Sequence, residues 1–151
     1  MKNLRRIAAM LVVLMLACLV FTACGKEVPD AGSVTVVLEA GETKYTVPLD
    51  KVEGNEGLVS VLNYLKTAEN VDFTYEDSSY GAFVTAVGDV KQDADNGIYL
   101  LFWTSVEADF DVSEYATTKT FEGKTLTSSG VGASSMTMEP GAVIYIGTVQ
   151  Y

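Results

Sequence analysis

The fold is decided by one stretch, Asn96-Gly97-Ile98-Tyr99-Leu100-Leu101-Phe102-Trp103-Thr104-Ser105, which holds the chain's single Trp. It opens on Asn-Gly, a strong turn signal, and then continues in apolar and aromatic residues, as a central strand does. Side chains alternate along a strand, so one face is expected to carry Ile98, Leu100 and Phe102 and the other Tyr99, Leu101 and Trp103. A strand with one wet face has a polar residue at every second position, and this one does not. Both faces must therefore be covered, one by the core and the other by a second layer, a partner or a ligand.

The N-terminus has the pattern of a secretion signal. Three basic residues (Lys2, Arg5, Arg6) precede an uncharged apolar run, 7–20, whose length of about 14 residues suits a signal peptide and is short for a membrane span. The following Phe21-Thr22-Ala23-Cys24-Gly25 resembles a bacterial lipobox, in which Cys24 becomes the lipidated first residue. Cys18 is the competing site, and an uncleaved anchor helix is the alternative. We expect a signal peptide at 1–23, a lipidated Cys and flexible tether at 24–32, and one domain at 33–151, lipid-anchored on the extracytoplasmic face of the bacterial cell membrane.

Charge and cysteine content limit the functions of the domain. Neither Cys lies beyond position 24, so the domain has no disulfide and no thiol chemistry and must be held by its core alone. Loss of the three basic residues of the signal changes the formal net charge from -10 to -13. A surface this acidic argues against nucleic acid as a partner and suits a domain held at the membrane by acyl chains.

The order of predicted elements indicates the fold class. Residues 33–39 and 43–49 read as a hairpin around 40–42, with Pro48 limiting the second strand to an edge or an end. The apolar stripe Leu58, Val61, Leu62 and Leu65 predicts one amphipathic helix, with Asn55 as its N-cap and Asn70 as its stop. Further strands are expected at 71–76, 80–88, 136–138 and 142–151, with an acidic loop at 89–96, a small hairpin at 118–126 and a tight glycine turn at 130–133. We therefore predict an α+β, β-grasp-like domain in which one helix packs on small, mostly antiparallel sheets.

Four segments occur in an order that resembles a known family. They are 79–87 (Ser-Tyr-Gly-Ala-Phe-Val-Thr-Ala-Val), 97–103 (Gly-Ile-Tyr-Leu-Leu-Phe-Trp), Gly130-Val131-Gly132 and the strand beginning Ala142-Val143-Ile144. The order resembles the C-terminal β domain of the cobalamin carriers transcobalamin and intrinsic factor, and more closely bacterial proteins of unknown function, many of them lipoproteins, that carry this transcobalamin-like domain. The resemblance covers about residues 33–151 and implies a helix clasped by two small sheets.

The same resemblance implies a ligand face. In the carriers, the strand that matches Tyr99 to Trp103 and the loop that matches Gly130 to Gly132 lie near the corrin. The carriers have Trp at the place of Leu100 and often Gln at the place of Leu101, whereas this chain has Leu at both and its Trp at 103. The resemblance implies cobalamin or a related corrinoid as a ligand in spite of these differences, and no cofactor is expected to be required. The candidate ligand-binding residues are Tyr80, Gly81, Tyr99, Leu101, Trp103, Gly130, Val131 and Gly132.

The composition excludes several enzyme classes. The chain has no His, which rules out Ser-His-Asp and Cys-His catalysis and His-containing zinc sites. No phosphate-binding glycine loop is present, and no carboxylate lies in an apolar setting that would suit general-acid work. The weak calcium candidate is Asp89, Asp93 and Asp95, whose spacing fits no EF-hand, and the ordinary interpretation of this stretch is a solvated acidic turn.

Two non-catalytic functions remain open. The first is a surface-anchored lipoprotein that captures a small molecule, such as a corrinoid, and passes it to a membrane transporter. The alternative is a protein-protein interaction or adhesive accessory module on the cell surface. Polar-edged aromatics such as Tyr80, Tyr99 and Trp103 suit a binding face, although each also suits an ordinary sheet core.

Overall fold

The structure is a computed structural model that describes residues 31–79 and 81–151. The predicted signal peptide, Cys24, the tether up to residue 30 and Tyr80 lie outside the described residues. Within the described ranges, no helix is long and apolar enough to cross a membrane.

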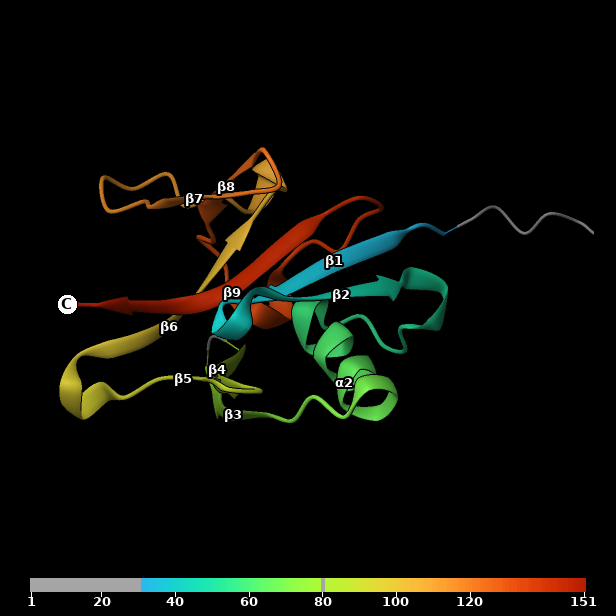
Figure 1. The fold of residues 1–151 in the computed structure, drawn as a ribbon, viewed down its shortest axis with the longest axis horizontal. Helices are drawn as coiled ribbons and strands as arrows, with labels where there is room; N and C mark the ends of the chain where they lie inside the picture. The colour runs from blue at the N-terminus through green and yellow to red at the C-terminus, as the bar shows by residue number, and fades with distance from the viewer. Residues whose placement is uncertain (1–30, 80) are drawn as a thin grey trace, which may run out of the picture. The chain divides into compact units, whose positions relative to one another are not determined.

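Six strands form one mixed sheet (Figure 1). They are β1 (Ser33–Leu38), β2 (Thr43–Pro48), β6 (Ile98–Thr104), β7 (Thr118–Phe121), β8 (Lys124–Ser128) and β9 (Val143–Gln150), in the order β2-β1-β9-β6-β8-β7. The β1–β9 pair is parallel and the other neighbours are antiparallel. The predicted central strand is β6, which pairs along its whole length with β9, from Ile98 opposite Gln150 to Thr104 opposite Ile144.

A second sheet and one helix complete the domain. The second sheet has the order β3-β4-β5 and consists of β3 (Phe73–Ser78), β4 (Gly81–Val87) and β5 (Val90–Lys91). The helix α2 spans Gly57–Glu69 and is the single α-helix of the described residues. Short 3-10 turns occupy η1 (Ala40–Glu42), η2 (Leu49–Lys51), η3 (Ala94–Asn96), η4 (Glu107–Asp109) and η5 (Ala133–Ser135). This arrangement confirms the predicted α+β class, with one helix packed against two sheets.

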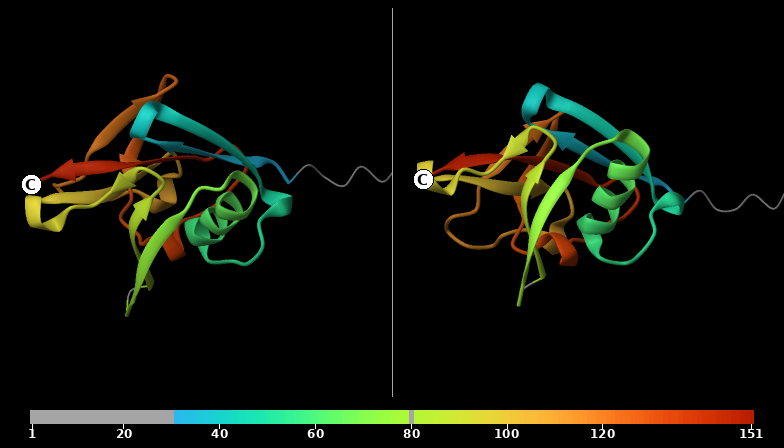
Figure 2. Two further views of the ribbon diagram at one scale, coloured as in Figure 1. Left: turned by 60° about the horizontal axis from the view of Figure 1, so that its bottom comes forward. Right: turned by 90° about the horizontal axis from the view of Figure 1, so that it is seen from below.

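The main core lies between the six-stranded sheet and the layer formed by α2 and the small sheet. Leu58, Leu62 and Leu65 of α2 are fully buried against inward side chains such as Val36 and Ile144. Phe73, Val84, Val87 and Val90 of the small sheet belong to the same cluster. The β7–β8 hairpin lies on the opposite side of β9 from α2 (Figures 1 and 2). Each face of the large sheet thus has its own cover.

Most predicted elements are confirmed, including both hairpins and the helix with its stop at Asn70, which adopts the left-handed conformation at φ 56°. Asn55 as N-cap is wrong. The helix begins at Gly57 after Glu56, whose side chain makes no cap, and the Glu56 N–H donates to Ser60 Oγ at 2.9 Å instead. The weak strand at 136–138 is also wrong, because Met136 is buried in the main core and Thr137 is bound to Asp109.

Candidate functional site

The two faces of β6 are both covered, as its sequence predicts. On the inner face, Leu100 and Phe102 pack against the main core. On the outer face, Leu101 packs against a second cluster that contains Trp103 and Tyr145. The other buried members of this outer cluster are Val37, Leu126 and Val143. We call the outward side chains of the β6–β9 pair, namely Tyr99, Leu101, Trp103, Tyr145 and Val149, the outer strip.

The large sheet curves so that the β7–β8 hairpin covers the outer strip. Strand β7 stands four places from β1 in the sheet order, which is about 19 Å in a flat sheet at the usual strand spacing. Lys119 of β7 nevertheless forms an ion pair with Glu39, the residue after β1. An ion pair also joins the two edges of the sheet, with 2.9 Å between Lys44 Nζ of β2 and Glu122 Oε1 of the β7–β8 turn. The sheet must therefore curl so that the β7–β8 hairpin folds over the outer face.

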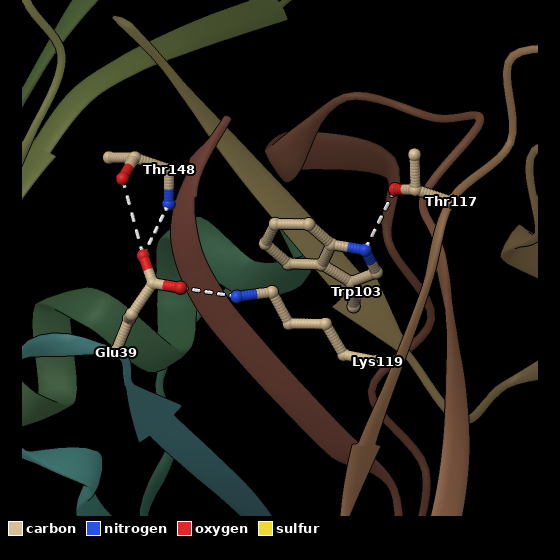
Figure 3. Close-up of polar contacts among 5 residues, drawn as sticks. All are labelled: Glu39, Trp103, Thr117, Lys119 and Thr148. Carbon is tan, nitrogen blue, oxygen red and sulfur yellow. Dashed lines mark hydrogen bonds and ion pairs between the residues drawn. The ribbon is translucent and has the colours of Figure 1, made fainter. Parts of the chain in front are cut away.

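Trp103 is closed off by this cover. Its side chain is 1% exposed, and its Nε1 donates to Thr117 Oγ1 at 3.0 Å (Figure 3). The Tyr145 ring meets the indole edge-on, with 6.0 Å between ring centroids and an interplanar angle of 82°. The Lys119 ammonium lies 4.4 Å from the Trp103 ring centroid and 4.6 Å from that of Tyr145, the geometry of a cation–π contact. Lys119 is therefore one of the side chains that cover the indole.

Glu39 holds Lys119 over the two rings. Its carboxylate accepts hydrogen bonds from the Lys119 ammonium, from the Thr148 N–H at 2.8 Å and from the Thr148 hydroxyl at 3.2 Å (Figure 3). Burial alone would raise the pKa of Glu39, but the hydrogen bonds and charge of Lys119 and the hydrogen bonds of Thr148 outweigh it and lower that pKa below 4.5. Glu39 therefore carries its negative charge at neutral pH.

Tyr145 supplies the second wall of this enclosure and stays neutral. Burial, and then the negative charges of Glu39 and Glu42, raise the pKa of its phenol above 10.0. Its ring also meets Phe121 of β7 at 6.2 Å between centroids. We call Trp103 and Tyr145, with Lys119 and Glu39 above them, the closed end of the outer strip.

The other end of the outer strip is open. Tyr99 is 40% exposed, and its register partner Val149 is partly buried. Tyr151, at the last position of the sequence given, is 82% exposed, with its ring 6.1 Å from that of Tyr99. Leu101 lies between the closed and open ends, opposite Gly147. The open end therefore presents aromatic and aliphatic side chains that continue the buried ones.

The predicted ligand residues fall into two groups. Tyr99, Leu101 and Trp103 lie together on the outer strip. Gly81 and the 130–132 loop lie at η5: a Cβ at Gly81 would be 3.1 Å from Ser134 Oγ, and the Ser135 N–H donates to the Gly132 carbonyl. Val131 of that loop packs against the main core, on the inner side of the sheet. The structure thus does not gather all the predicted residues into one site.

The buried residue Asp109 has a structural role, because its hydrogen bonds hold two loops together. Asp109 is 3% exposed, and its carboxylate accepts hydrogen bonds from the N–H and hydroxyl of Thr137 at 2.6 and 2.9 Å. Its carbonyl accepts the Gly130 N–H at 2.9 Å. Asp109 therefore ties the 130–132 loop to the segment after η5.

The calcium candidate does not assemble into a site. Asp93 accepts hydrogen bonds from the backbone N–H and the side-chain amide of Asn96, at 3.3 and 2.6 Å, and so caps η3. Within 31–79 and 81–151, no group of three or more His, Cys, Asp or Glu residues could hold a metal ion. The prediction of a loop over 89–96 is wrong in part, because Val90–Lys91 form β5 beside β4 and Ala94–Asn96 form η3, which leads into β6.

The structure also contains an open cleft that the sequence did not indicate. It has a volume of about 450 Å³ and lies where the β1–β2 hairpin approaches the end of α2. Apolar side chains such as Leu38 and Tyr45 line it together with Glu69, Asp72, Asp89 and Lys91. Its walls come from three separate segments, 38–45, 69–72 and 88–91, so no local motif marks it.

Sequence reasoning missed three residues of the closed end of the outer strip, namely Glu39, Lys119 and Tyr145. A signal for Lys119 existed, because alternation in the predicted 118–126 hairpin places it on the same face as Phe121. Its pairing with Glu39 joins residues 80 positions apart, and no local pattern indicates that.

Comparisons with known proteins support the fold. No family model matches the chain, and no curated protein sequence does. Among solved structures, the chain is similar to haptocorrin in complex with Cbi, with a TM-score of 0.52 and 18% identity over 80% of this chain and 25% of the haptocorrin chain. The chain thus spans about a quarter of the length of that protein. The likeness shows the fold class, an α+β domain of the kind that haptocorrin contains.

A second solved structure is more distant. It is a protein from Ruminococcus gnavus ATCC 29149 described as a candidate metal binding protein, with a TM-score of 0.46 and 17% identity. The match covers 79% of this chain and 95% of that one.

Proposed function

We propose that this chain is a non-catalytic ligand-binding module that holds a small molecule against the open end of the outer strip. The observation that carries the proposal is the exposure of Tyr99 at 40%, in line with the buried Trp103 on the same face of β6. Exposed aromatic side chains beside a packed apolar floor give a ligand dispersion contacts and area to bury, with little ordering cost on the protein side.

A corrinoid is the first ligand to test. The support is the likeness of the fold to haptocorrin, whose structure contains Cbi, together with the order of segments that resembles the carriers. In this proposal the lipid anchor at Cys24 holds the module on the outer side of the bacterial membrane, where it passes its ligand to a transporter. Catalysis has no part in the proposal, because the chain has no His and the one buried carboxylate of the described residues, Asp109, is bound to Thr137.

The experiment is a calorimetric titration of the full chain with cobalamin and, separately, with cobinamide. Tyr99→Ser is expected to weaken binding at least about tenfold, because it removes the exposed ring without disturbing a buried one. Tyr75→Ser is the matched control, since Tyr75 is 47% exposed on the small sheet and should leave binding unchanged. Absence of binding at high micromolar concentration would remove the corrinoid version of the proposal.

The protein-protein alternative also has a specific observation in its favour. In the loop between η4 and β7, Val112 is 97% exposed and Tyr115 is 77% exposed. Hydrogen bonds from the Ser113 N–H to Asp111 Oδ1 and from the Tyr115 N–H to Ser113 Oγ, at 2.8 and 3.3 Å, shape this loop locally. If the module docks on a surface protein through it, Val112→Ser with Tyr115→Ser should abolish photo-cross-linking to that protein on intact cells. Corrinoid binding should then be unaffected.

A further inference from the structure

The closed end of the outer strip has the composition of an amine-binding site. Two aromatic rings, Trp103 and Tyr145, face one ammonium at 4.4 and 4.6 Å, and a carboxylate forms an ion pair with the same ammonium. Aromatic faces and a carboxylate are the groups with which proteins recognise ammonium ligands. Here the ammonium belongs to the chain itself, as Lys119.

The carboxylate of this enclosure is positioned without help from Lys119. The N–H and hydroxyl of Thr148 both bind Glu39 Oε2. Gly147 leaves room for it, since a Cβ at that position would lie 2.8 Å from the same oxygen. Removal of the Lys119 ammonium would therefore leave Glu39 held by Thr148 at the edge of the aromatic pair.

The Lys119 ammonium is carried by the β7–β8 hairpin, which pairs with the rest of the sheet over a short length. The β7–β8 hairpin pairs with β6 through only two register pairs, Trp103 with Ser128 and Thr104 with Thr127, whereas β6 and β9 share seven. The Lys119 side chain is 25% exposed and Glu39 33%, so water and solutes reach the ion pair. The formal net charge of -10 also raises the local concentration of cations around the chain.

We propose that Trp103, Tyr145 and Glu39 form a binding site for a primary ammonium group, which the chain fills with its own Lys119. An external amine, either a small molecule or the side chain of a partner's lysine, enters by displacing Lys119 from the rings. The contact of Lys119 with the two rings is then autoinhibitory, because it keeps ligands without a cation out of the closed end of the outer strip. The proposal does not depend on whether the open end binds a corrinoid.

The test is chemical rescue of Lys119→Ala, with the intrinsic fluorescence of Trp103 as the readout, because it is the chain's single Trp. The fragment that this variant lacks is n-propylammonium, and 1-propanol is the neutral control at constant ionic strength. The variant is expected to show a saturable fluorescence change with n-propylammonium, with a Kd of about 1–10 mM, and none with 1-propanol. The wild-type chain should need at least about tenfold more amine, because its tethered ammonium competes at high effective concentration.

A second variant tests the carboxylate. Adding Glu39→Gln to Lys119→Ala should weaken n-propylammonium binding at least about tenfold, because the charge-assisted hydrogen bond is lost. A folded Lys119→Ala chain that ignores the amine, or that responds equally to 1-propanol, overturns the proposal.

A measurement on the wild-type chain covers the case in which Lys119→Ala does not fold. The ε-methylene protons of Lys119 should show an upfield ring-current shift in the NMR spectrum, because the ammonium lies over two rings. Excess n-propylammonium should reduce that shift, and an equal concentration of sodium chloride should not. A shift that is absent, or that both salts reduce equally, contradicts the proposal.

Discussion

The inner and outer faces of β6 and β9 are both buried, but by different means. The inner face is covered by α2 and the small sheet, and the main core there consists of hydrophobic side chains. The outer face is covered by a hairpin with two register pairs to β6 and by the Glu39–Lys119 ion pair. Burial of hydrophobic side chains dominates the first cover, whereas the second combines a smaller hydrophobic cluster around Leu126 and Phe121 with a few specific polar contacts. The outer face is therefore where this domain can open at low cost.

The largest expected effect compares one leucine from each cover. Leu62 of α2 and Leu126 of β8 are both 0% exposed. Leu62→Ala should lower the free energy of unfolding by about 3–5 kcal/mol, because packed elements surround the cavity and cannot collapse into it. Leu126→Ala should cost about 2–3 kcal/mol, because the short hairpin can settle into the space. Urea unfolding of both variants measures the difference, and equal or reversed costs would show that the two covers are equally rigid.

The next effect tests how tightly the outer contacts fit. Gly147→Ala places a Cβ within 2.8 Å of Glu39 Oε2, so the carboxylate must leave its place beside Thr148. We expect a loss of about 1–3 kcal/mol in the free energy of unfolding, the usual range for overpacking.

A double-mutant cycle with Glu39→Ala isolates the cause of that loss. Once the carboxylate is absent, Gly147→Ala should be neutral or stabilising by about 0.4–1 kcal/mol, since it restricts the unfolded chain. Additive costs would mean that the clash lies elsewhere than at Glu39.

The inner face could be predicted from the sequence far better than the outer one. Alternation in β6 and the helical stripe of α2 are local signals, so they placed Leu100, Phe102 and the α2 leucines correctly. The same alternation placed Trp103 on the outer face but could not say what covers it. The cover comes from sheet curvature, which joins Glu39 to Lys119 across four strand positions and leaves no local trace. The candidate ligand residues also included Gly81 and Val131 beside Trp103, but Gly81 lies against Ser134 and Val131 packs against the main core.

A smaller effect follows from the charge on Glu39. The lowered pKa of its carboxyl means that the folded state binds its proton less tightly than the unfolded chain, whose value is 4.5. The stabilisation is therefore fully present above pH 4.5 and is lost as the pH falls through the folded-state pKa. Glu39→Gln should cost about 1 kcal/mol at neutral pH, a modest value for a carboxylate that is one-third exposed.

The readout is the difference in unfolding free energy between wild type and Glu39→Gln across the acid range, since other carboxylates titrate in both chains. That difference should shrink as the solution is acidified. A difference that is flat with pH would show that Glu39 contributes by packing and not by its charge.

The smallest effect concerns the ion pair that closes the sheet at its two edges. Lys44 and Glu122 are 2.9 Å apart with side chains 43% and 61% exposed, so water and salt screen their attraction. Lys44→Ala should change the free energy of unfolding by less than about 1 kcal/mol, and added salt should remove most of the effect. The Glu39–Lys119 pair, which is less exposed and lies over two rings, should keep its contribution in the same salt. If the two pairs respond alike to salt, the outer cover owes its stability to Leu126 and Phe121, and Lys119 is a surface charge that happens to lie over the rings.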